Sequence, residues 1–174
     1  MTISLLIVDN ELEWCDQIKE HLEKRPNIEV VGILHRAEDA VKTAPELNPH
    51  VILLDMLFGK GRMGGITAIE RLRASSVTSK ILVFSTIGEE DKVFSALQAG
   101  ANSYVWKAEG LEDIADAVEA TSQGISVCSP TIARKLEKRL DHLLKRLYGI
   151  SLKEILRGEA EEGTGASGES PISR

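Results

Sequence analysis

Four apolar runs of this chain each end at polar residues that could do chemistry. Those residues are Asp9 with Asn10, Asp55, Ser85 with Thr86, and Lys107. Two facing carboxylates repel each other, and a divalent cation relieves that repulsion; hard oxygen ligands suit Mg²⁺. A hydroxyl and an ammonium beside an Asp–Mg²⁺ pair would suit an incoming phosphoryl group. These residue types therefore predict phosphoryl transfer with Asp55 as the nucleophile.

Each of these residues, taken alone, also has an ordinary structural explanation. Asp9 or Asn10 could cap a helix that begins at Glu11, because Asp and Asn are preferred N-caps. Lys107 alone could be a solvated surface charge, and Ser85 alone could be a loop hydroxyl. The placement of one such group at the end of each of four runs favours the functional interpretation.

The elements that must position these groups are predicted from hydrophobic patterning. Short runs rich in Val, Ile or Leu indicate strands buried on both faces of a parallel sheet. The five predicted strands are Ile3–Val8, Ile28–Leu34, Val51–Leu54, Ile81–Phe84 and Ser103–Trp106. The amphipathic segments that follow them predict five helices: Leu12–Arg25, Ala37–Leu47 with an interruption at Pro45, Ile66–Ala74, Glu89–Ala99 and Leu111–Gln123. This alternation predicts a doubly wound α/β sandwich, in which ligands bind beyond the carboxyl ends of the strands.

The overall composition narrows the class of protein. The 174 residues include 21 Lys and Arg against 27 Asp and Glu, and this acidic balance argues against a whole-surface nucleic-acid binder. No apolar run reaches the ~18 residues of a membrane span, and the N-terminus lacks the basic start of a secretory signal. Only Cys15 and Cys128 are present, which fits a reducing compartment. We therefore expect a cytoplasmic protein that does not contact the membrane.

A change of pattern at Gly124 divides the chain into three expected parts. Residues 1–124 form the α/β domain, and residues 125–157 form a connector with an amphipathic helix from Thr131 to about Tyr148 and a short helical turn at Leu152–Leu156. Residues 158–174 are rich in Gly, Ser, Glu and Thr, so we expect a disordered tail.

The amphipathic helix carries apolar residues at alternating spacings of three and four, which is an a/d seam. The seam consists of Ala133, Leu136, Leu140, Leu143, Leu147 and Ile150. It predicts a homodimer, although the seam is short and packing of the helix on its own domain is the alternative. The rest of this helix is largely basic, which usually means a solvated face, with an anionic partner as the other interpretation.

The motifs together resemble the receiver domain of bacterial two-component response regulators. The resemblance rests on Leu5–Asn10, Val51–Asp55, Ile81–Thr86 and Ala99–Lys107, and it covers about Ile3 to Gly124. It implies a flavodoxin-like (βα)5 fold with strand order 2-1-3-4-5, and a phosphoryl group passed from a sensor histidine kinase to Asp55. By the same match, Ser85 is the switch hydroxyl, Lys107 the cation that pairs with the phosphoryl group, and Tyr104 the aromatic switch residue. The resemblance implies a signalling protein rather than an enzyme.

Two departures from the family pattern bear on the predicted Mg²⁺ site, whose ligands would be Asp9, Asn10, Asp55 and the main-chain carbonyl of Leu57. The family has two adjacent acids where this chain has Asp9-Asn10, and Asn brings no negative charge, so Mg²⁺ affinity should fall. The segment after Asp55 lacks the usual Met-Pro pair and is slightly longer, with Gly64-Gly65 in place of an Asp-Gly turn.

The stretch Gln123–Pro130 and the helix after it resemble the connector of NarL/FixJ-type regulators. That family continues into a helix-turn-helix domain, which Leu147–Gly158 is too short to hold, so DNA binding is implied by the family alone. The first hypothesis is a phosphorelay receiver that switches an interaction face and regulates transcription by family analogy. The second, motivated by Asn10 and the altered loop, is a phosphorylation-independent interaction or dimerisation protein. A flavodoxin-like enzyme or flavin carrier fits poorly, because the loop after the first strand has no phosphate cradle.

Overall fold

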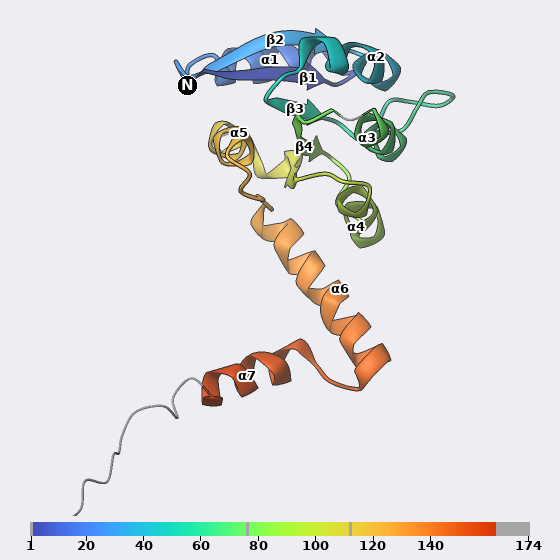
Figure 1. Ribbon diagram of the computed structural model, residues 1–174, viewed down its shortest axis with the longest axis vertical. Coiled ribbons are helices and arrows are strands. Elements are labelled where there is room, and N and C mark those ends of the chain that lie inside the picture. The colour runs from blue at the N-terminus through green and yellow to red at the C-terminus, as the bar shows by residue number, and fades with distance from the viewer. Residues whose placement is uncertain (1, 76, 112, 163–174) are drawn as a thin grey trace, which may run out of the picture. The chain divides into compact units, whose positions relative to one another are not determined.

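Five parallel strands form one sheet in the order β2-β1-β3-β4-β5, as predicted (Figure 1). In this computed structural model the strands are β1 (Ile3–Val8), β2 (Ile28–Leu34), β3 (Val51–Leu54), β4 (Lys80–Ser85) and β5 (Ser103–Trp106). Residues 2–75, 77–111 and 113–162 are described by the structure. The central strand β3 is buried at every position, because helices cover both faces of the sheet.

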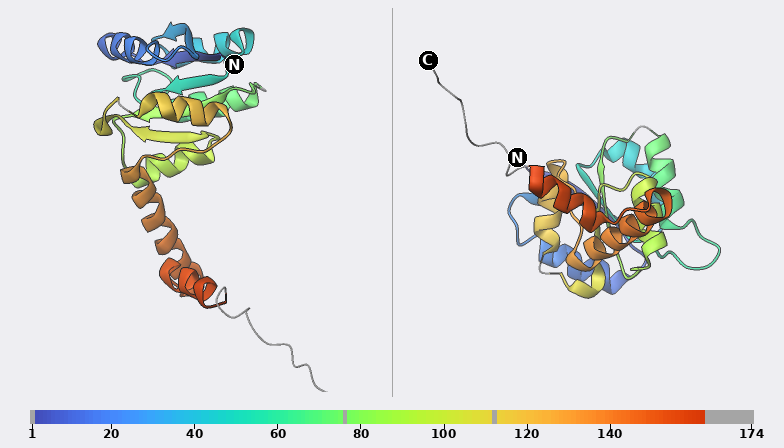
Figure 2. Two further views of the ribbon diagram at one scale, coloured as in Figure 1. Left: turned by 90° about the vertical axis from the view of Figure 1, so that its left-hand side faces the viewer. Right: turned by 90° about the horizontal axis from the view of Figure 1, so that it is seen from below.

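The helices follow the strands in two layers, with α1 and α5 on one face of the sheet and α2, α3 and α4 on the other (Figures 1 and 2). They are α1 (Leu12–Leu22), α2 (Ala37–Leu47), α3 (Gly65–Ala74), α4 (Glu90–Gln98) and α5 (Ile114–Ser122), with a short 3₁₀ helix, η1 (Lys107–Glu109), directly after β5. The expected interruption at Pro45 was wrong, because α2 runs through it to Leu47. Pro45 lies in the last turn, where a missing N–H costs only one hydrogen bond. The helix then ends at Asn48, whose left-handed φ is 44°.

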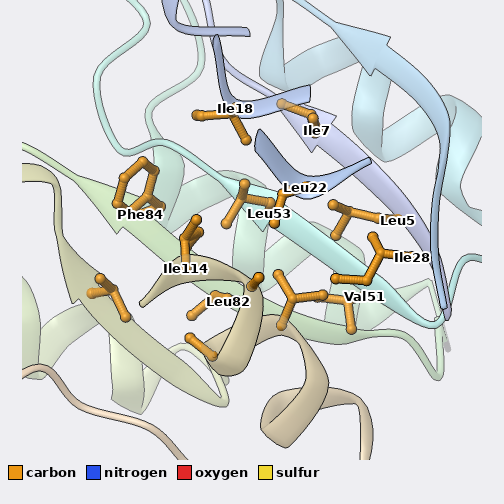
Figure 3. Close-up of a cluster of buried hydrophobic side chains, with 14 of the residues drawn as sticks. Leu5, Ile7, Ile18, Leu22, Ile28, Val51, Leu53, Leu82, Phe84 and Ile114 are labelled. Atoms are coloured by element: carbon orange, nitrogen blue, oxygen red, sulfur yellow. The ribbon is translucent and has the colours of Figure 1, made fainter. Parts of the chain in front are cut away.

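One hydrophobic cluster joins α1 and α5 to the sheet (Figure 3). Alternate residues of each strand point to this face, so Leu5 and Ile7 of β1 and Leu53 of β3 contact the same cluster. Phe84 of β4 completes it at the carboxyl end of the sheet. This packing fixes the strand ends relative to one another and therefore fixes the polar residues that follow them.

The connector after α5 lies along the outer edge of β5. The N–H of Tyr104 donates to the carbonyl of Val127 at 2.8 Å, and the N–H of Ser129 donates to the carbonyl of Tyr104 at 3.2 Å. The main chain of the connector thus pairs with the edge strand, where unpaired groups would otherwise be exposed.

Contacts divide the chain into two units, Met1–Ala133 and Arg134–Arg174. The C-terminal helices are α6 (Pro130–Tyr148) and α7 (Leu152–Glu162), and the main-chain N–H of Leu152 donates to Asp141 Oδ1 at 2.9 Å. The expected helical turn at Leu152–Leu156 is therefore longer, and α7 includes residues 158–162 of the expected tail. The remainder of that tail lies outside the described residues. Within the described residues, no helix is long and apolar enough to cross a membrane.

Candidate functional site

The register of the sheet brings the ends of four strands to one edge. Val8 of β1 is paired with Leu54 of β3, and Leu54 is paired with Val83 of β4, so Asp9 and Asp55 leave the sheet at the same level. The pairing continues one residue further, because the N–H of Asp55 donates to the carbonyl of Val8 at 2.9 Å. Two carboxylates are thereby held side by side on neighbouring strands.

Lys107 joins these two carboxylates. Its Nζ lies 2.5 Å from Asp9 Oδ2 and 3.7 Å from Asp55 Oδ1. The three side chains are between 1% and 4% exposed, so the ammonium attracts both carboxylates with little screening by water. The structure therefore brings together three of the residues predicted from the strand ends and gives Lys107 a closer contact with Asp9 than with Asp55.

The two oxygens of Asp55 have different surroundings. Oδ2 accepts a hydrogen bond from the main-chain N–H of Leu57 at 3.0 Å. Oδ1 is buried and accepts no hydrogen bond from the residues that the structure describes. Burial raises the pKa of Asp55 and the charge of Asp9 adds to that rise, while the charge of Lys107 opposes it. One carboxylate oxygen is thus left without a donor beside an ammonium.

Ser85 and Tyr104 both form hydrogen bonds with Ile87, in the loop after β4. The N–H of Ile87 donates to Ser85 Oγ at 3.3 Å, and the hydroxyl of Tyr104 donates to the carbonyl of Ile87 at 2.7 Å. Tyr104 is fully buried, and this burial raises its pKa. The predicted switch hydroxyl and the predicted aromatic switch residue are therefore connected through the main chain of one residue, Ile87.

The other predicted metal ligands are placed differently from Asp9 and Asp55. Asn10 is exposed, and Leu57 is 48% exposed. Asp9 does not cap α1, whose N-cap is Glu11; instead its Oδ1 accepts the Glu11 N–H at 2.9 Å. Among the described residues, no three His, Cys, Asp or Glu side chains converge on a point that could hold a metal ion.

The longer segment after Asp55 is held at Met63 and is closed where Gly65 packs against Met56. The N–H of Met63 donates to Glu38 Oε1 at 3.0 Å, and this bond lowers the pKa of Glu38. Gly65 begins α3 against the main chain of Met56, and a Cβ at Gly65 would lie 2.7 Å from the Met56 Cα. Only glycine allows that approach, which explains Gly65, whereas a Cβ at Gly64 would meet nothing within 4 Å.

Sequence reasoning missed two aromatic side chains beside Lys107. The Nζ lies 5.5 Å from the ring centroid of Trp14 in α1 and 5.9 Å from that of Phe84 in β4. The spacing of four residues from Trp14 to Ile18, which is 1% exposed, places both on the inner face of α1 and was the available signal.

Known proteins are similar to this chain in sequence and in fold. A family model described as the response regulator receiver domain matches residues 5–119. Response regulator protein VraR of Staphylococcus aureus (strain NCTC 8325 / PS 47) is 36% identical over 140 residues, which are 80% of this chain and 66% of that protein. The chain therefore spans slightly less than two thirds of the length of this curated relative.

Two solved structures agree with the topology. A two-component response regulator of the LuxR family from Aurantimonas sp. SI85-9A1 has a TM-score of 0.75 at 27% identity, covering 80% of this chain and 99% of that one. The isolated REC domain of RcsB from Salmonella enterica serovar Typhimurium, in the presence of the phosphomimetic BeF3-, has a TM-score of 0.72 at 22% identity. That match covers 79% of this chain and 100% of the REC domain, and it supports the fold.

Proposed function

The chain belongs to the response regulators, with a receiver domain of the NarL/FixJ type, and on that premise we propose that Asp55 accepts a phosphoryl group from a sensor histidine kinase. In the transfer, an Asp55 carboxylate oxygen forms a bond to phosphorus while the phosphorus–nitrogen bond of the donor's phosphohistidine breaks. The imidazole leaves with the bonding electron pair and takes up a proton. The chain acts as a signalling protein that is modified in this step.

The observation that carries the proposal is the sharing of Lys107 by Asp9 and Asp55. The ammonium is 3.7 Å from Asp55 Oδ1, the buried oxygen that accepts no hydrogen bond from the described part of the chain. A phosphoryl group on Asp55 would bring new anionic oxygens to the side of the carboxylate that Lys107 faces. Charge-assisted contacts with the ammonium would stabilise those oxygens.

The donor set also supports a Mg²⁺ ion beside Asp55. Asp9 and Asp55 would hold it, with the Asn10 side chain and the Leu57 carbonyl as further oxygen ligands. When bound, the ion would neutralise charge on the phosphoryl oxygens. Asp9 already pairs with Lys107 at 2.5 Å and Asn10 is neutral, so we expect weaker Mg²⁺ binding than at a site with two adjacent acids.

The contacts of Tyr104 suggest how a change at Asp55 would spread. Ser85 is fully buried next to the site, and Ile87 contacts both Ser85 and Tyr104. The main chain of Tyr104 is in turn paired with Val127 and Ser129 of the connector. If Ser85 shifts toward a phosphoryl group, the loop after β4 and the connector should change position together. Such a coupled change is expected of a switch with two states.

We place the output of this switch in the C-terminal helices and propose that α6 mediates homodimerisation. Leu140 and Leu147 are 46% and 65% exposed, while Leu136 and Leu143 are half-buried. Part of the a/d seam is thus open to a second copy.

RcsB, a structural neighbour, has been solved as dimers bound to DNA. For this chain, DNA binding and a role in transcription are proposals by family analogy, as is a cytoplasmic location.

The phosphoacceptor is tested by incubating the full chain with acetyl phosphate and Mg²⁺ and measuring intact mass. We expect a gain of one phosphoryl group in the wild type and none in Asp55→Asn. Removing Mg²⁺ with a chelator should suppress the gain. An equal mass gain in Asp55→Asn, or none in the wild type at donor concentrations that modify other receivers, would contradict the proposal.

The second candidate function is a phosphorylation-independent interaction protein, and the exposed, neutral Asn10 is the observation that favours it. The two functions differ in their response to metal. If Trp14 and Trp106 fluorescence shows saturable Mg²⁺ binding at low millimolar concentration, the phosphorylation-independent function is disfavoured.

A further inference from the structure

Two aromatic rings flank the Lys107 ammonium. Trp14 of α1 and Phe84 of β4 meet edge to face, with ring centroids 6.1 Å apart and planes inclined at 82°. The Lys107 Nζ lies within 6 Å of both centroids, which is the range of a cation–π contact. The ammonium is thus surrounded by two carboxylates and two rings.

The two rings differ in how firmly the core holds them. Phe84 is 1% exposed and belongs to the cluster beneath α1 and α5, so its loss would leave a cavity. Trp14 is half-buried at the edge of the same cluster. A change at Trp14 therefore tests the contact with Lys107 at a smaller cost to the core.

We propose that Trp14 is a positioning residue that holds the Lys107 ammonium beside Asp55. The inference deepens the proposed function and rests on it. A lysine stem has four rotatable bonds, and holding its charge at one place costs conformational entropy. The rings restrict the ammonium without binding it through a directed hydrogen bond. Lys107 can therefore turn from Asp9 toward a phosphoryl group on Asp55 while it keeps its contact with the indole.

The first test compares two replacements of Trp14 in the full chain. Trp14→Leu keeps an apolar side chain and removes the π system, while Trp14→Phe keeps an aromatic ring. We expect acetyl phosphate to label Trp14→Leu about fivefold more slowly than the wild type, the size of a partly buried cation–π contact. Trp14→Phe should remain within about twofold of the wild type. Thermal unfolding of both variants verifies that they are folded under the assay conditions.

The second test reads the indole directly. In a Trp106→Phe background, Trp14 is the only tryptophan in the chain. Beryllium fluoride with Mg²⁺ serves as the phosphoryl mimic, and we expect its addition to change Trp14 emission as the ammonium moves. The same addition to an Asp55→Asn, Trp106→Phe chain should leave the emission unchanged.

The outcomes separate the two proposals. Equal labelling rates with Trp, Leu and Phe at position 14 would overturn this inference while leaving Asp55 as the phosphoacceptor. Equal slowing in Leu and Phe would also overturn it, because a purely structural role does not distinguish an aromatic ring from a comparable aliphatic chain. A wild-type chain that takes no phosphoryl group would overturn the proposed function and this inference with it.

Discussion

The hydroxyl of Tyr104 donates a hydrogen bond to the main-chain oxygen of Ile87 at 2.7 Å, from a fully buried side chain. The main chain of the same residue is paired with Val127 and Ser129. Tyr104 therefore links the loop that follows Ser85 to the connector that leads into α6. Because the Tyr104 side chain is buried, its hydroxyl stays in contact with the loop.

Replacing Tyr104 by Phe should loosen the loop after β4. The variant loses one buried hydrogen bond to Ile87 and should be destabilised by about 1 kcal/mol, as measured by urea unfolding. Hydrogen exchange at the Ile87 amide should accelerate relative to the strands. Tyr148→Phe is the matched control, because Tyr148 is 71% exposed and its hydroxyl is not needed in the core. Equal stability of the two variants would contradict a role for the Tyr104 bond.

Replacing Asp55 by Asn should stabilise the chain at neutral pH. The pKa of Asp55 is raised by burial above its usual value of 3.8, so ionising this group costs free energy in the folded state. Asn does not ionise, and Lys107 remains paired with Asp9. We expect a higher free energy of unfolding than in the wild type at pH 7, measured by urea unfolding. The penalty of the wild type disappears as pH falls through the raised pKa toward 3.8, because Asp55 then becomes protonated. The difference in stability between Asp55→Asn and the wild type should therefore shrink over that window.

Replacing Asp9 by Asn should have the opposite effect. Lys107 would lose its partner at 2.5 Å and keep only Asp55 at 3.7 Å, inside a site that is nearly closed to water. Breaking a buried ion pair from one side costs about 3 kcal/mol, and the same urea titration measures it. A loss no larger than that of an exposed carboxylate, such as Glu13→Gln, would show that the Asp9–Lys107 contact does not stabilise the fold.

Arg73 of α3 is expected to be important for stability although it is remote from the site. It donates to the carbonyls of Gly100 and Ser79 at 2.9 and 2.8 Å, and to the Asn102 side chain at 2.8 Å. Arg73→Met removes these three hydrogen bonds, although Asn102 Oδ1 keeps the main-chain N–H of Ile81 as a donor, and should cost about 2 kcal/mol or more in thermal or urea unfolding. Arg71→Met on the exposed side of the same helix should stay within about 0.5 kcal/mol of the wild type.

The dimer proposal is tested at Leu140, which is 46% exposed. Leu140→Asp places a charge at the centre of the proposed interface and should shift sedimentation from dimer toward monomer, because an unpaired charge is costly to bury. His142→Asp adds a carboxylate at an exposed α6 position outside the a/d seam and should sediment as the wild type does. Unchanged sedimentation of Leu140→Asp would contradict the dimer.

Much of the fold follows from local pattern. The apolar runs predict the strands because a strand buried on both faces needs a nearly continuous apolar sequence, and four of the five strand ranges agree at both ends. The fifth, β4, extends one residue further at each end, to Lys80 and Ser85. Helix ends were less accurate, and Pro45 did not interrupt α2, because capping and tertiary contacts decide where a helix stops.

Part of the candidate site also follows from local sequence, and part depends on tertiary contacts. Sequence alone determined that Asp9, Asp55, Ser85 and Lys107 lie at the ends of parallel strands, and neighbouring parallel strands end at one edge of a sheet. Only the tertiary structure decided which groups meet there. Lys107 approaches Asp9 more closely than Asp55, Asn10 is exposed, and Trp14 reaches the ammonium from another element. The physical reason is range: a strand end is set by residues adjacent in the chain, whereas a side-chain contact depends on packing between segments far apart in the sequence.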